Sequence, residues 1–427
     1  MPNLWNGRNW EDTSGQIDRA VHDRQYRMVI GLNVVENLDL IEGALLLAQG
    51  RGRYLRLKHA ITDEIAINLS LTNKLKQIRD SATASWSEIA PLVSDLAGLQ
   101  ANLVANLNRQ AGKYVDRVLA VSVLDPGFWT EDFDHRPIYH PMCDPSQLAE
   151  LSGISVVDAF PERDLAIGGT GGPLQALPYW ILFADRNAKT ATHHKAVIEI
   201  KDQIHAFCLP PSDGLDADIP EIKKIQSPGL RPLIRCVKDF GVDNEPNWQD
   251  WFTHGRLVSQ WSQRWDSILR QHDFRTDEFE IQIIRSMSAL ISSGLQFKEL
   301  TRTWIDWICT LLWRSLEKIL LDQLVLSADS VFTPILLSQL QHLTRTQSLE
   351  IVSAEQGNDC PALHSHVAGI LGFFHIDQMP ANLPEMTGAD SLRILGRLTP
   401  GRPASWRKLV QMMADYHPAP MRLRDAI

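Results

Sequence analysis

The stretch of this chain with the clearest chemical potential is rich in glycine and contains an adjacent pair of opposite charges. It runs from Phe160 to Leu174, and Arg163 and Asp164 lie just before its glycines. Four glycines fall within five positions, interrupted only by Thr170: Gly168, Gly169, Gly171 and Gly172. Glycine lets the backbone approach a ligand closely, or turn where a Cβ would clash. The residues alone leave two interpretations open: a ligand-binding loop, or a tight strand-to-helix connection with Asp164 as a cap.

Composition narrows the classes of function. The chain has 427 residues, which suggests two or three domains, with 44% hydrophobic and 22% charged residues, as in an ordinary soluble protein. The formal charge of −9 argues against nucleic acid or an anionic membrane as the main partner. No apolar stretch has the length of a signal segment or a transmembrane helix, so we expect a cytoplasmic protein. The five cysteines are odd in number and far apart, which predicts reduced thiols and no metal site.

Strands and helices must position the glycine-rich stretch. A strand-like run over 154–157 leads into it, and an apolar segment over 177–183 leads out. Near the start of the chain, strands are expected over 26–32 and 41–48 with a turn over 33–40 between them, the opening hairpin of a mixed sheet. Apolar residues at helical spacing predict a helix over 85–110 that stops near Gly112.

The rest of the pattern alternates strands with helices. A short helix follows Asp144, the expected N-cap, with Pro145 at its first position. Two helices are expected over 279–325, split near Gly294, and another over 334–343. We interpret 210–232 as a long connection and the Trp-rich 240–256 as a surface excursion. Further strands are expected over four ranges: 117–123, 195–200, 204–209 and 324–326. This alternation predicts an α/β protein in two lobes.

Three stretches together resemble the anhydro-N-acetylmuramic acid kinase family. The segment 143–157, Cys-Asp-Pro-Ser-Gln-Leu-Ala-Glu-Leu-Ser-Gly-Ile-Ser-Val-Val, resembles a family segment with Gly-Asp-Pro, Ala-Glu, Thr-Gly-Ile and Val-Val. The segment 160–174 is similar to Phe-Arg-x-Arg-Asp-x-Ala-x-Gly-Gly-Gln-Gly-Ala-Pro-Leu. The segment 380–400 resembles the family's closing Asn-x-Pro-Ser-Val-Thr-Gly-Ala and Leu-Gly. Order and spacing agree, and the resemblance extends from about residue 29 to residue 400.

The resemblance implies a two-lobed α/β fold of the actin, heat-shock chaperone and sugar-kinase type, with mixed sheets flanked by helices and an interlobe cleft. We therefore expect an N-terminal extension over 1–27, lobe 1 over 28–145 and 390–427, and lobe 2 over 146–389. Family enzymes are homodimers of peptidoglycan recycling. With Mg-ATP they open the 1,6-anhydro ring of an amino sugar hydrolytically and phosphorylate its O6.

The resemblance also implies site residues. Asp164 matches the family's base, which activates the attacking water, and a carboxylate in a partly buried cleft suits that task. Arg163 would oppose a rise in the pKa of Asp164 if both side chains faced the same way. Gly31 and Asp39 match surviving positions of the first nucleotide loop. The expected substrate loop consists of Arg163, Gly168, Gly169, Thr170 and Gly171.

The phosphate loops depart from the family pattern. In the first, Val35 and Glu36 replace the Gly-Thr of Gly-Leu-Met-Ser-Gly-Thr-Ser-x-Asp-Gly-x-Asp, and β-branched residues resist turns that aim N–H groups at a phosphate. Elsewhere Lys201-Asp202 replaces two glycines, Gln226 replaces an acidic residue expected near the metal, and 328–330, which includes Asp329, replaces Gly-Gly-Gly. Near the sugar, 122–126 replaces Ser-His-Gly-Gln-Thr.

These changes leave three hypotheses. Three of the four nucleotide loops gain an acid, which favours a pseudokinase that keeps the fold and binds an amino sugar or a protein partner without phosphoryl transfer. The maintained Asp164 loop favours an active sugar kinase with an altered Mg-ATP site. A phosphate-independent anhydrosugar hydrolase, with Asp164 still activating water, is the third. The pseudokinase needs no cofactor.

Overall fold

The fold was analysed in a computed structural model of the chain. It describes residues 26–414 except for 82, 132–135, 187–192, 201–202, 213–219, 243–245, 328–330, 346, 348 and 355–361. The chain divides into two compact units. Unit 1 consists of Met1–Leu182 with Cys360–Ile427, and unit 2 of Phe183–Asp359. These boundaries differ from those expected from the sequence, at 145/146 and 389/390, because strand β7 at Val156–Asp158 pairs with β4 of unit 1. The expected extension 1–27 lies outside the described residues except for its last two.

Unit 1 is built on a six-stranded sheet with the order β13-β7-β4-β1-β2-β3. Strands β1, β2 and β3 are antiparallel neighbours, β4 and β7 continue the sheet in parallel with β1, and β13 pairs antiparallel with β7. The strands are β1 Tyr26–Val34, β2 Leu40–Gln49, β3 Arg56–Ala66, β4 Val118–Leu124, β7 Val156–Asp158 and β13 Arg397–Thr399. The expected opening hairpin is confirmed, whereas β3 was not anticipated. A separate hairpin pairs β5 Phe128–Glu131 with β6 Pro137–His140.

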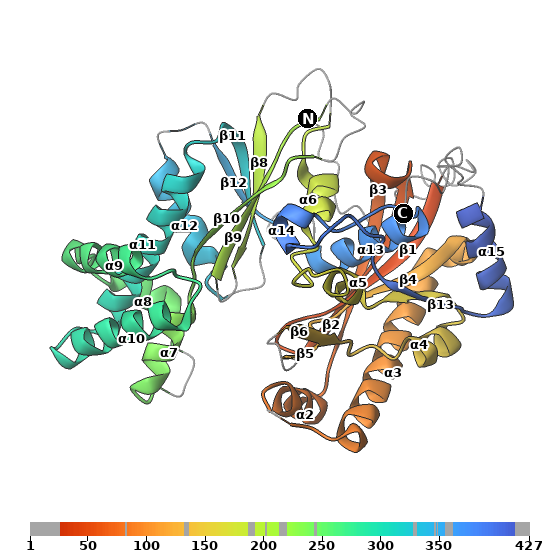
Figure 1. The fold of residues 1–427 in the computed structure, drawn as a ribbon, viewed down its shortest axis with the longest axis horizontal. Coiled ribbons are helices and arrows are strands. Elements are labelled where there is room, and N and C mark those ends of the chain that lie inside the picture. The colour runs from red at the N-terminus through yellow and green to blue at the C-terminus, as the bar shows by residue number, and fades with distance from the viewer. Residues whose placement is uncertain are drawn as a thin grey trace. The chain divides into compact units, whose positions relative to one another are not determined.

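Helices cover both faces of this sheet. Gly31 of β1 faces α13, and Gly43, which is paired with Leu32, faces α3. Successive residues of a strand point to opposite faces, so α13 and α3 lie on opposite sides. The helices of unit 1 are α2 Leu69–Arg79, α3 Trp86–Ala111, α4 Pro145–Ser152, α5 Phe160–Leu165, α6 Ala176–Phe183, α13 Leu363–Ile376, α14 Pro384–Thr387 and α15 Pro403–Ala414. Single 3₁₀ turns occupy Gly52–Tyr54 and Gly112–Arg117. Figure 1 shows the sheet with these helices around it.

Unit 2 repeats the strand order of unit 1. Its five-stranded sheet has the order β10-β9-β8-β11-β12, again with three antiparallel strands followed by two parallel ones. The strands are β8 His194–Ile200, β9 Gln203–Leu209, β10 Lys223–Pro228, β11 Leu321–Leu326 and β12 Glu350–Ser353. Two mixed sheets with one shared order, each with helices packed against it, confirm the expected fold class.

The helices of unit 2 gather on one side of its sheet in Figure 1. They are α7 Arg231–Asp239, α8 Trp248–His254, α9 Ser259–Gln271, α10 Asp277–Ser292, α11 Phe297–Leu316 and α12 Thr333–Thr344. The expected split near Gly294 is confirmed, with φ of 100° at that glycine. The Trp stripe of α11 is core, as its spacing predicts: Trp304 and Trp265 are fully buried and their rings lie 5.1 Å apart.

Two expectations for unit 2 are wrong. The segment 240–256 is not only a surface excursion, because it contains α8, whose Phe252 is 4% exposed and whose Trp251 stacks on Phe297 at 5.5 Å. The long connection 210–232 contains β10, an edge strand of the sheet. Both segments are rich in polar residues or proline, and packing against the large apolar face of α11 overrides that composition.

Two remaining expectations concern membranes and cysteines. Among the described residues, no helix combines the length and apolar character needed to cross a bilayer. Cys143, Cys208, Cys236 and Cys309 are buried thiols without disulfide partners, and the fifth, Cys360, lies outside the described residues. Burial raises the pKa of Cys309 beyond its ordinary value of 9.0, and the pKa of Cys208 to about 11, so these thiols stay protonated near neutral pH.

Candidate functional site

The candidate site of unit 1 lies where three strands of its sheet end. Asn33 near the end of β1 is opposite Leu124 at the end of β4, and β7 runs parallel beside β4. Parallel strands bring their carboxyl ends to one edge, the usual place for ligands in open α/β sheets. The β1–β2 turn, Asp125 and Asp158 therefore meet at this edge, and α5 follows directly after β7.

Asp164, the candidate base, is fully buried near the end of α5. Its Oδ2 accepts a hydrogen bond from the backbone N–H of Gly171 at 2.9 Å. The N–H of Gly169 donates to the carbonyl of Asp164 at 2.9 Å, and a Cβ at Gly169 would overlap the Asp164 carboxylate. The glycine-rich loop thus wraps around this side chain, which explains the need for glycine at position 169.

The other carboxylate oxygen of Asp164 holds the closing segment of the chain. Its Oδ1 accepts hydrogen bonds from Asn382 Nδ2 at 3.0 Å and from Thr387 Oγ1 at 2.8 Å. Thr170 extends the contact, because its N–H donates to the carbonyl of Thr387 at 2.8 Å. Asp164 therefore joins two segments more than 200 positions apart, and three protein donors already occupy its two oxygens.

Of the other expected loop residues, Arg163, Gly168 and Thr170 lie at the surface, whereas Gly171 does not. The Arg163 side chain is exposed while that of Asp164 is buried, so the two do not face the same way. Gly168 is exposed and has φ of 82°, a conformation that favours glycine. Gly171 has φ of 77° and is buried, with Trp129 2.7 Å from the position that a Cβ would take. The structure thus brings Asp164, Gly169, Thr170 and Gly171 together and turns Arg163 away.

A second carboxylate, Asp125, lies at the same sheet edge and was given no role in the sequence analysis. Three donors converge on its Oδ1: the N–H groups of Gly127 at 2.9 Å and Met142 at 3.0 Å, and the hydroxyl of Tyr139 at 3.0 Å. Asp125 is 6% exposed, and burial raises its pKa to about 6 against the opposing effect of these donors. The charge of Asp158 raises it further.

The β5–β6 hairpin places aromatic rings beside both carboxylates. Tyr139 packs over Gly127, whose φ of 66° and missing Cβ make room for the ring. Trp129 donates from Nε1 to the carbonyl of Pro126 at 2.8 Å and packs edge-on against Tyr139 at 5.1 Å between centroids. It remains 46% exposed beside Gly171. A fixed aromatic surface therefore lies between the Asp125 turn and the glycine-rich loop.

The β1–β2 turn, the expected first phosphate loop, is closed by its own hydrogen bonds. The N–H of Val35 donates to Leu40 at 3.1 Å, and the N–H of Leu38 donates to Val35 at 2.9 Å. The Leu38 side chain is fully buried, whereas Glu36 and Asp39 are exposed. These backbone N–H groups are therefore committed within the protein, and the exposed tip of the turn carries a negative charge. A phosphate-binding turn, in contrast, offers free N–H donors and has no anion nearby.

Gly31, the other expected nucleotide position, lies inside β1 rather than in the turn. It is paired with Ala44 and is buried against α13. A Cβ there would overlap the carbonyl oxygen of Ser365 and approach the nitrogen of Gly369. In this structure Gly31 allows a helix to pack closely on a strand.

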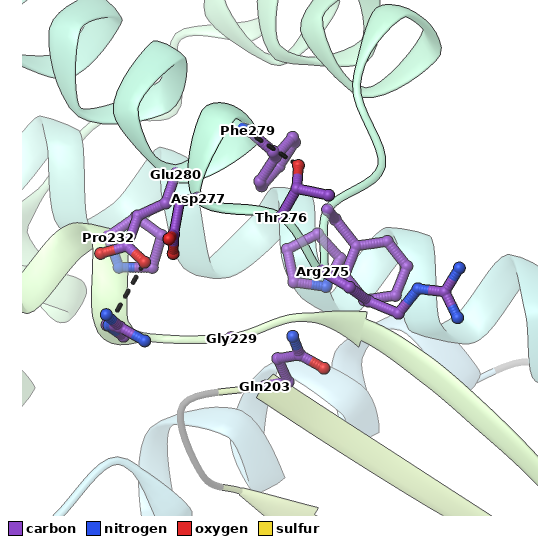
Figure 2. A pocket seen from close by; sticks show the side chains of 11 residues that line it. Gln203, Gly229, Pro232, Arg275, Thr276, Asp277, Phe279 and Glu280 are labelled. Atoms are coloured by element: carbon purple, nitrogen blue, oxygen red, sulfur yellow. Dashed lines mark hydrogen bonds and ion pairs between the residues drawn. The ribbon is translucent and has the colours of Figure 1, made fainter. Parts of the chain in front are cut away.

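In unit 2 a small cavity lies at the start of α10, close to two of the expected nucleotide segments (Figure 2). Its volume is about 70 Å³, and Gln203 and Gly229 form part of its wall. Arg231 and Arg235 pair with Glu280 at 3.2 Å each. Pockets for drug-sized ligands have volumes of roughly 300–1,000 Å³, so this cavity is smaller than a typical ligand pocket. Lys201, Asp202 and Asp329 fall outside the described residues.

In the described part of the chain, no group of three or more His, Cys, Asp or Glu side chains is arranged to hold a metal ion. Gln226, which replaces the acidic residue expected near a metal, lies 3.3 Å from the His205 ring through its amide nitrogen.

Comparison with known proteins places this geometry in a family context. The family model for anhydro-N-acetylmuramic acid kinase matches residues 27–198. The anhydro-N-acetylmuramic acid kinase of Bordetella avium is 24% identical over 390 residues, which cover 88% of this chain and 97% of that protein. That of Nitrosomonas europaea is 23% identical over 385 residues, covering 87% and 99%. The chain is a diverged relative of the anhydro-N-acetylmuramic acid kinases.

Solved structures are more distant. Component A of (R)-2-hydroxyglutaryl-CoA dehydratase from Acidaminococcus fermentans aligns over 81% of this chain and 99% of its own, with 8% identity and a TM-score of 0.40. An inorganic polyphosphate/ATP-glucomannokinase from Arthrobacter sp. strain KM aligns over 81% and 98%, with 12% identity and a TM-score of 0.33. The fold assignment therefore rests on the strand orders of the two sheets and not on these chains.

Three residues of the site were not predicted from the sequence. Asn382 and Thr387 belong to the closing segment that resembles the kinase family, yet nothing in their spacing shows that they bind Asp164. Asp125 lies in the stretch that replaces the family's Ser-His-Gly-Gln-Thr. Its position directly after a buried strand and before Pro-Gly was the available signal, because such a residue lies at a ligand-facing sheet edge.

Proposed function

We propose that this chain is a pseudokinase of the anhydro-N-acetylmuramic acid kinase type, which binds an amino sugar at the Asp164 edge of unit 1 without transferring phosphate. Its relatives are named for an amino-sugar substrate. The Asp164 loop is well ordered by hydrogen bonds, which supports a retained sugar site. We place the protein in cell-wall amino-sugar metabolism, in the cytoplasm and as a homodimer, on the same resemblance.

The closed β1–β2 turn is the observation that carries this proposal. Two of its backbone N–H groups donate inside the turn, and Arg79 donates to the carbonyl of Glu36 at 2.6 Å. One like-charge contact at about 4 Å costs about 1 kcal/mol in water and about 4 kcal/mol at an effective dielectric near 20. Micromolar ATP affinity corresponds to only about 8 kcal/mol, so Glu36 and the lost donors together would remove most of it.

A second candidate is an active sugar kinase, or a hydrolase that opens the anhydro ring without phosphate. The maintained Asp164 loop favours it, because Asp164 would accept a proton from the attacking water. Mg-ATP would serve the kinase alone, as phosphate donor. The three donors on Asp164 weigh against this role, since they already occupy both of its carboxylate oxygens.

The test is an incubation of the full chain with Mg-ATP and 1,6-anhydro-N-acetylmuramic acid, read by mass spectrometry, beside Asp164→Asn and a thermal-shift titration with each ligand. We expect a thermal shift with sugar, none with ATP, and no product. Ring-opened, 6-phosphorylated sugar that is absent from Asp164→Asn would establish the kinase. Ring-opened sugar without phosphate would establish the hydrolase. Absence of any sugar-induced shift would overturn the amino-sugar assignment itself.

The homodimer is tested separately by sedimentation velocity of the full chain. A single species at twice the monomer mass of 48.2 kDa is expected, and a monomer at micromolar concentration would contradict it.

A further inference from the structure

The Asp125 carboxylate is anchored by one oxygen and open at the other. All three of its protein donors bind Oδ1. Among the described residues none donates to Oδ2, and this atom is not fully buried. The three bonds to Oδ1 fix the direction of the carboxylate, and its second oxygen, Oδ2, keeps its capacity to accept a hydrogen bond from a ligand hydroxyl. This differs from Asp164, whose two oxygens are both engaged by protein donors.

Trp129 supplies an apolar surface close to Asp125, because its ring packs against Tyr139, whose hydroxyl donates to Asp125. The Trp129 indole is fixed by the hydrogen bond to Pro126 and by the Tyr139 ring. Trp129 is 46% exposed, and because its side chain is already ordered, a ligand that binds there does not pay the entropy cost of ordering it. A half-exposed, fixed aromatic ring beside a hydrogen-bond acceptor presents an apolar face and a polar edge together. Saccharides offer the matching chemistry, with C–H groups on one face and hydroxyl donors at the rim.

The charges around Asp125 select against an anion. Asp158 is fully buried at the end of the neighbouring strand and raises the pKa of Asp125. Arg397 is paired with Asp158 at 2.6 Å and neutralises that residue rather than Asp125. Of the donors that hold Asp125, two are backbone N–H groups and one is a hydroxyl, so none brings a formal charge.

We propose that Asp125 and Trp129 form a subsite for an uncharged saccharide, in which Oδ2 of Asp125 accepts from a hydroxyl and disfavours a carboxylate-bearing sugar. The subsite rests on the proposed sugar-binding function and narrows its ligand. The relatives are named for an acidic amino sugar, so the preference proposed for this chain differs from the substrate in their names.

The selectivity depends on pH because Asp125 titrates close to neutrality. At pH 7.5 it is ionised and repels an anionic ligand; as the pH falls through about 6 it becomes protonated and the repulsion is lost. The titratable groups that act on Asp125 directly are Tyr139, Asp158 and Cys143. Arg397, Glu162 and Asp144 act on Asp158 and so reach Asp125 indirectly.

The experiment compares two sugars that differ by one acidic group, 1,6-anhydro-N-acetylglucosamine and 1,6-anhydro-N-acetylmuramic acid, by calorimetric titration of the full chain. At pH 7.5 the uncharged sugar should bind at least about tenfold more tightly, as expected for one like-charge contact. Asp125→Asn should reduce the preference below about threefold, because it removes the negative charge. The local structure should persist, since the amide can keep its oxygen toward the three donors. Asp95→Asn, at an exposed site on α3, is the matched control and should change nothing.

Two further arms keep the inference falsifiable. Lowering the pH to 5 should narrow the preference of the unmodified chain and leave Asp125→Asn unchanged. Trp129→Ala should weaken both sugars by a similar factor. Equal binding of the two sugars at pH 7.5, unaffected by Asp125→Asn, would overturn the subsite and leave the proposed function standing. Binding of neither sugar would overturn the proposed function and the subsite with it.

Discussion

Among single residues, Asp164 has the largest structural role in the site. A catalytic base needs an oxygen that can reach a substrate proton, whereas this carboxylate joins the glycine-rich loop to the closing segment through Gly171, Asn382 and Thr387. The two roles are separable by experiment, because replacing a residue that links two segments lowers the stability of the fold, whereas replacing a catalytic base lowers the turnover rate.

Asp164→Asn should therefore destabilise unit 1. The amide can keep its oxygen toward Asn382 and Thr387, but its NH₂ then faces the N–H of Gly171, leaving two buried donors opposed. A buried unsatisfied group costs about 1–3 kcal/mol. We expect the melting temperature to fall by several degrees, about 2–4 °C per kcal/mol for a unit of this size. Asp95→Asn is the control. An unchanged melting temperature in both variants would exclude the proposed role of Asp164 in linking the two segments.

The burial of His366 leads us to expect that unit 1 loses stability in acid. It is fully buried in α13, faces the carbonyl of Ala362 through Nδ1 at 3.0 Å, and burial lowers its pKa to about 4. The unfolded pKa is near 6.5, so its contribution is complete above pH 6.5 and is lost as the pH falls toward 4. The size is about 3 kcal/mol.

The measurement is the melting temperature at pH 7.5 and pH 5 for the unmodified chain and His366→Asn, whose amide can replace the Nδ1 donor. We expect the gap between the two pH values to narrow in the variant. An equal gap in both proteins would assign the acid sensitivity to other groups, such as His375, whose pKa burial also lowers.

Among the elements, the contact of α13 with β1 is the closest packing around the site. Gly31 and Gly369 face each other there, and Gly372 lies against Ser122 of β4. Ser122 donates to the carbonyl of Ala368 at 2.6 Å, which ties the same helix to β4. A row of small residues thus lets a helix lie directly on the strands that lead to the candidate site.

Gly31→Ala should test this packing. The added methyl would overlap the backbone of Ser365 and Gly369, so we expect a loss of at least about 3 kcal/mol and a clear fall in the melting temperature. Gly98→Ala is the matched control, because Gly98 lies inside α3 with nothing within 4 Å of the added methyl. It should stabilise by up to about 1 kcal/mol. Equal effects at the two sites would contradict the close packing.

The elements also show what the sequence could and could not predict. Helix α4 was predictable because Asp144, Pro145 and Gly153 are local signals, and each has its expected place in the cap, the first turn and the C-terminus. Helix α8 was not, because its polar composition masks contacts of Trp251 and Phe252 that only the folded chain supplies. The partners of Asp164 could not be predicted for the same reason, since pairing across 218 positions leaves no local pattern in the sequence.

In the molecule as a whole, unit 1 is assembled from two distant parts of the chain. The buried ion pair of Arg27 and Asp377 joins them across 350 positions. Arg27 Nη2 also donates to the carbonyl of Gly50 at 2.6 Å, and the N–H of Gly52 donates to Asp377 at 2.7 Å. The first described strand and the end of α13 are thereby held together at one point.

Arg27→Met should therefore unfold unit 1 selectively. It leaves Asp377 buried without its charge partner, which costs about 3–5 kcal/mol. Limited proteolysis should then degrade 26–182 and 360–414 faster than 183–359. Lys223→Met, at an exposed pair with Glu221, is the control and should leave the digestion pattern unchanged. Uniform acceleration across both units would show that they unfold together.

Unit 2, in contrast, is one continuous segment with its own core, and its independence can be tested directly. Seven of the 13 tryptophans lie within Phe183–Asp359, and Trp265, Trp304 and Trp307 form a buried cluster between α9 and α11. A continuous segment with a complete sheet and core meets the physical conditions for folding alone. The fragment 183–359 should show blue-shifted tryptophan emission that moves to the red in one cooperative urea transition. Emission typical of exposed indole without denaturant would show that unit 2 needs unit 1 to fold.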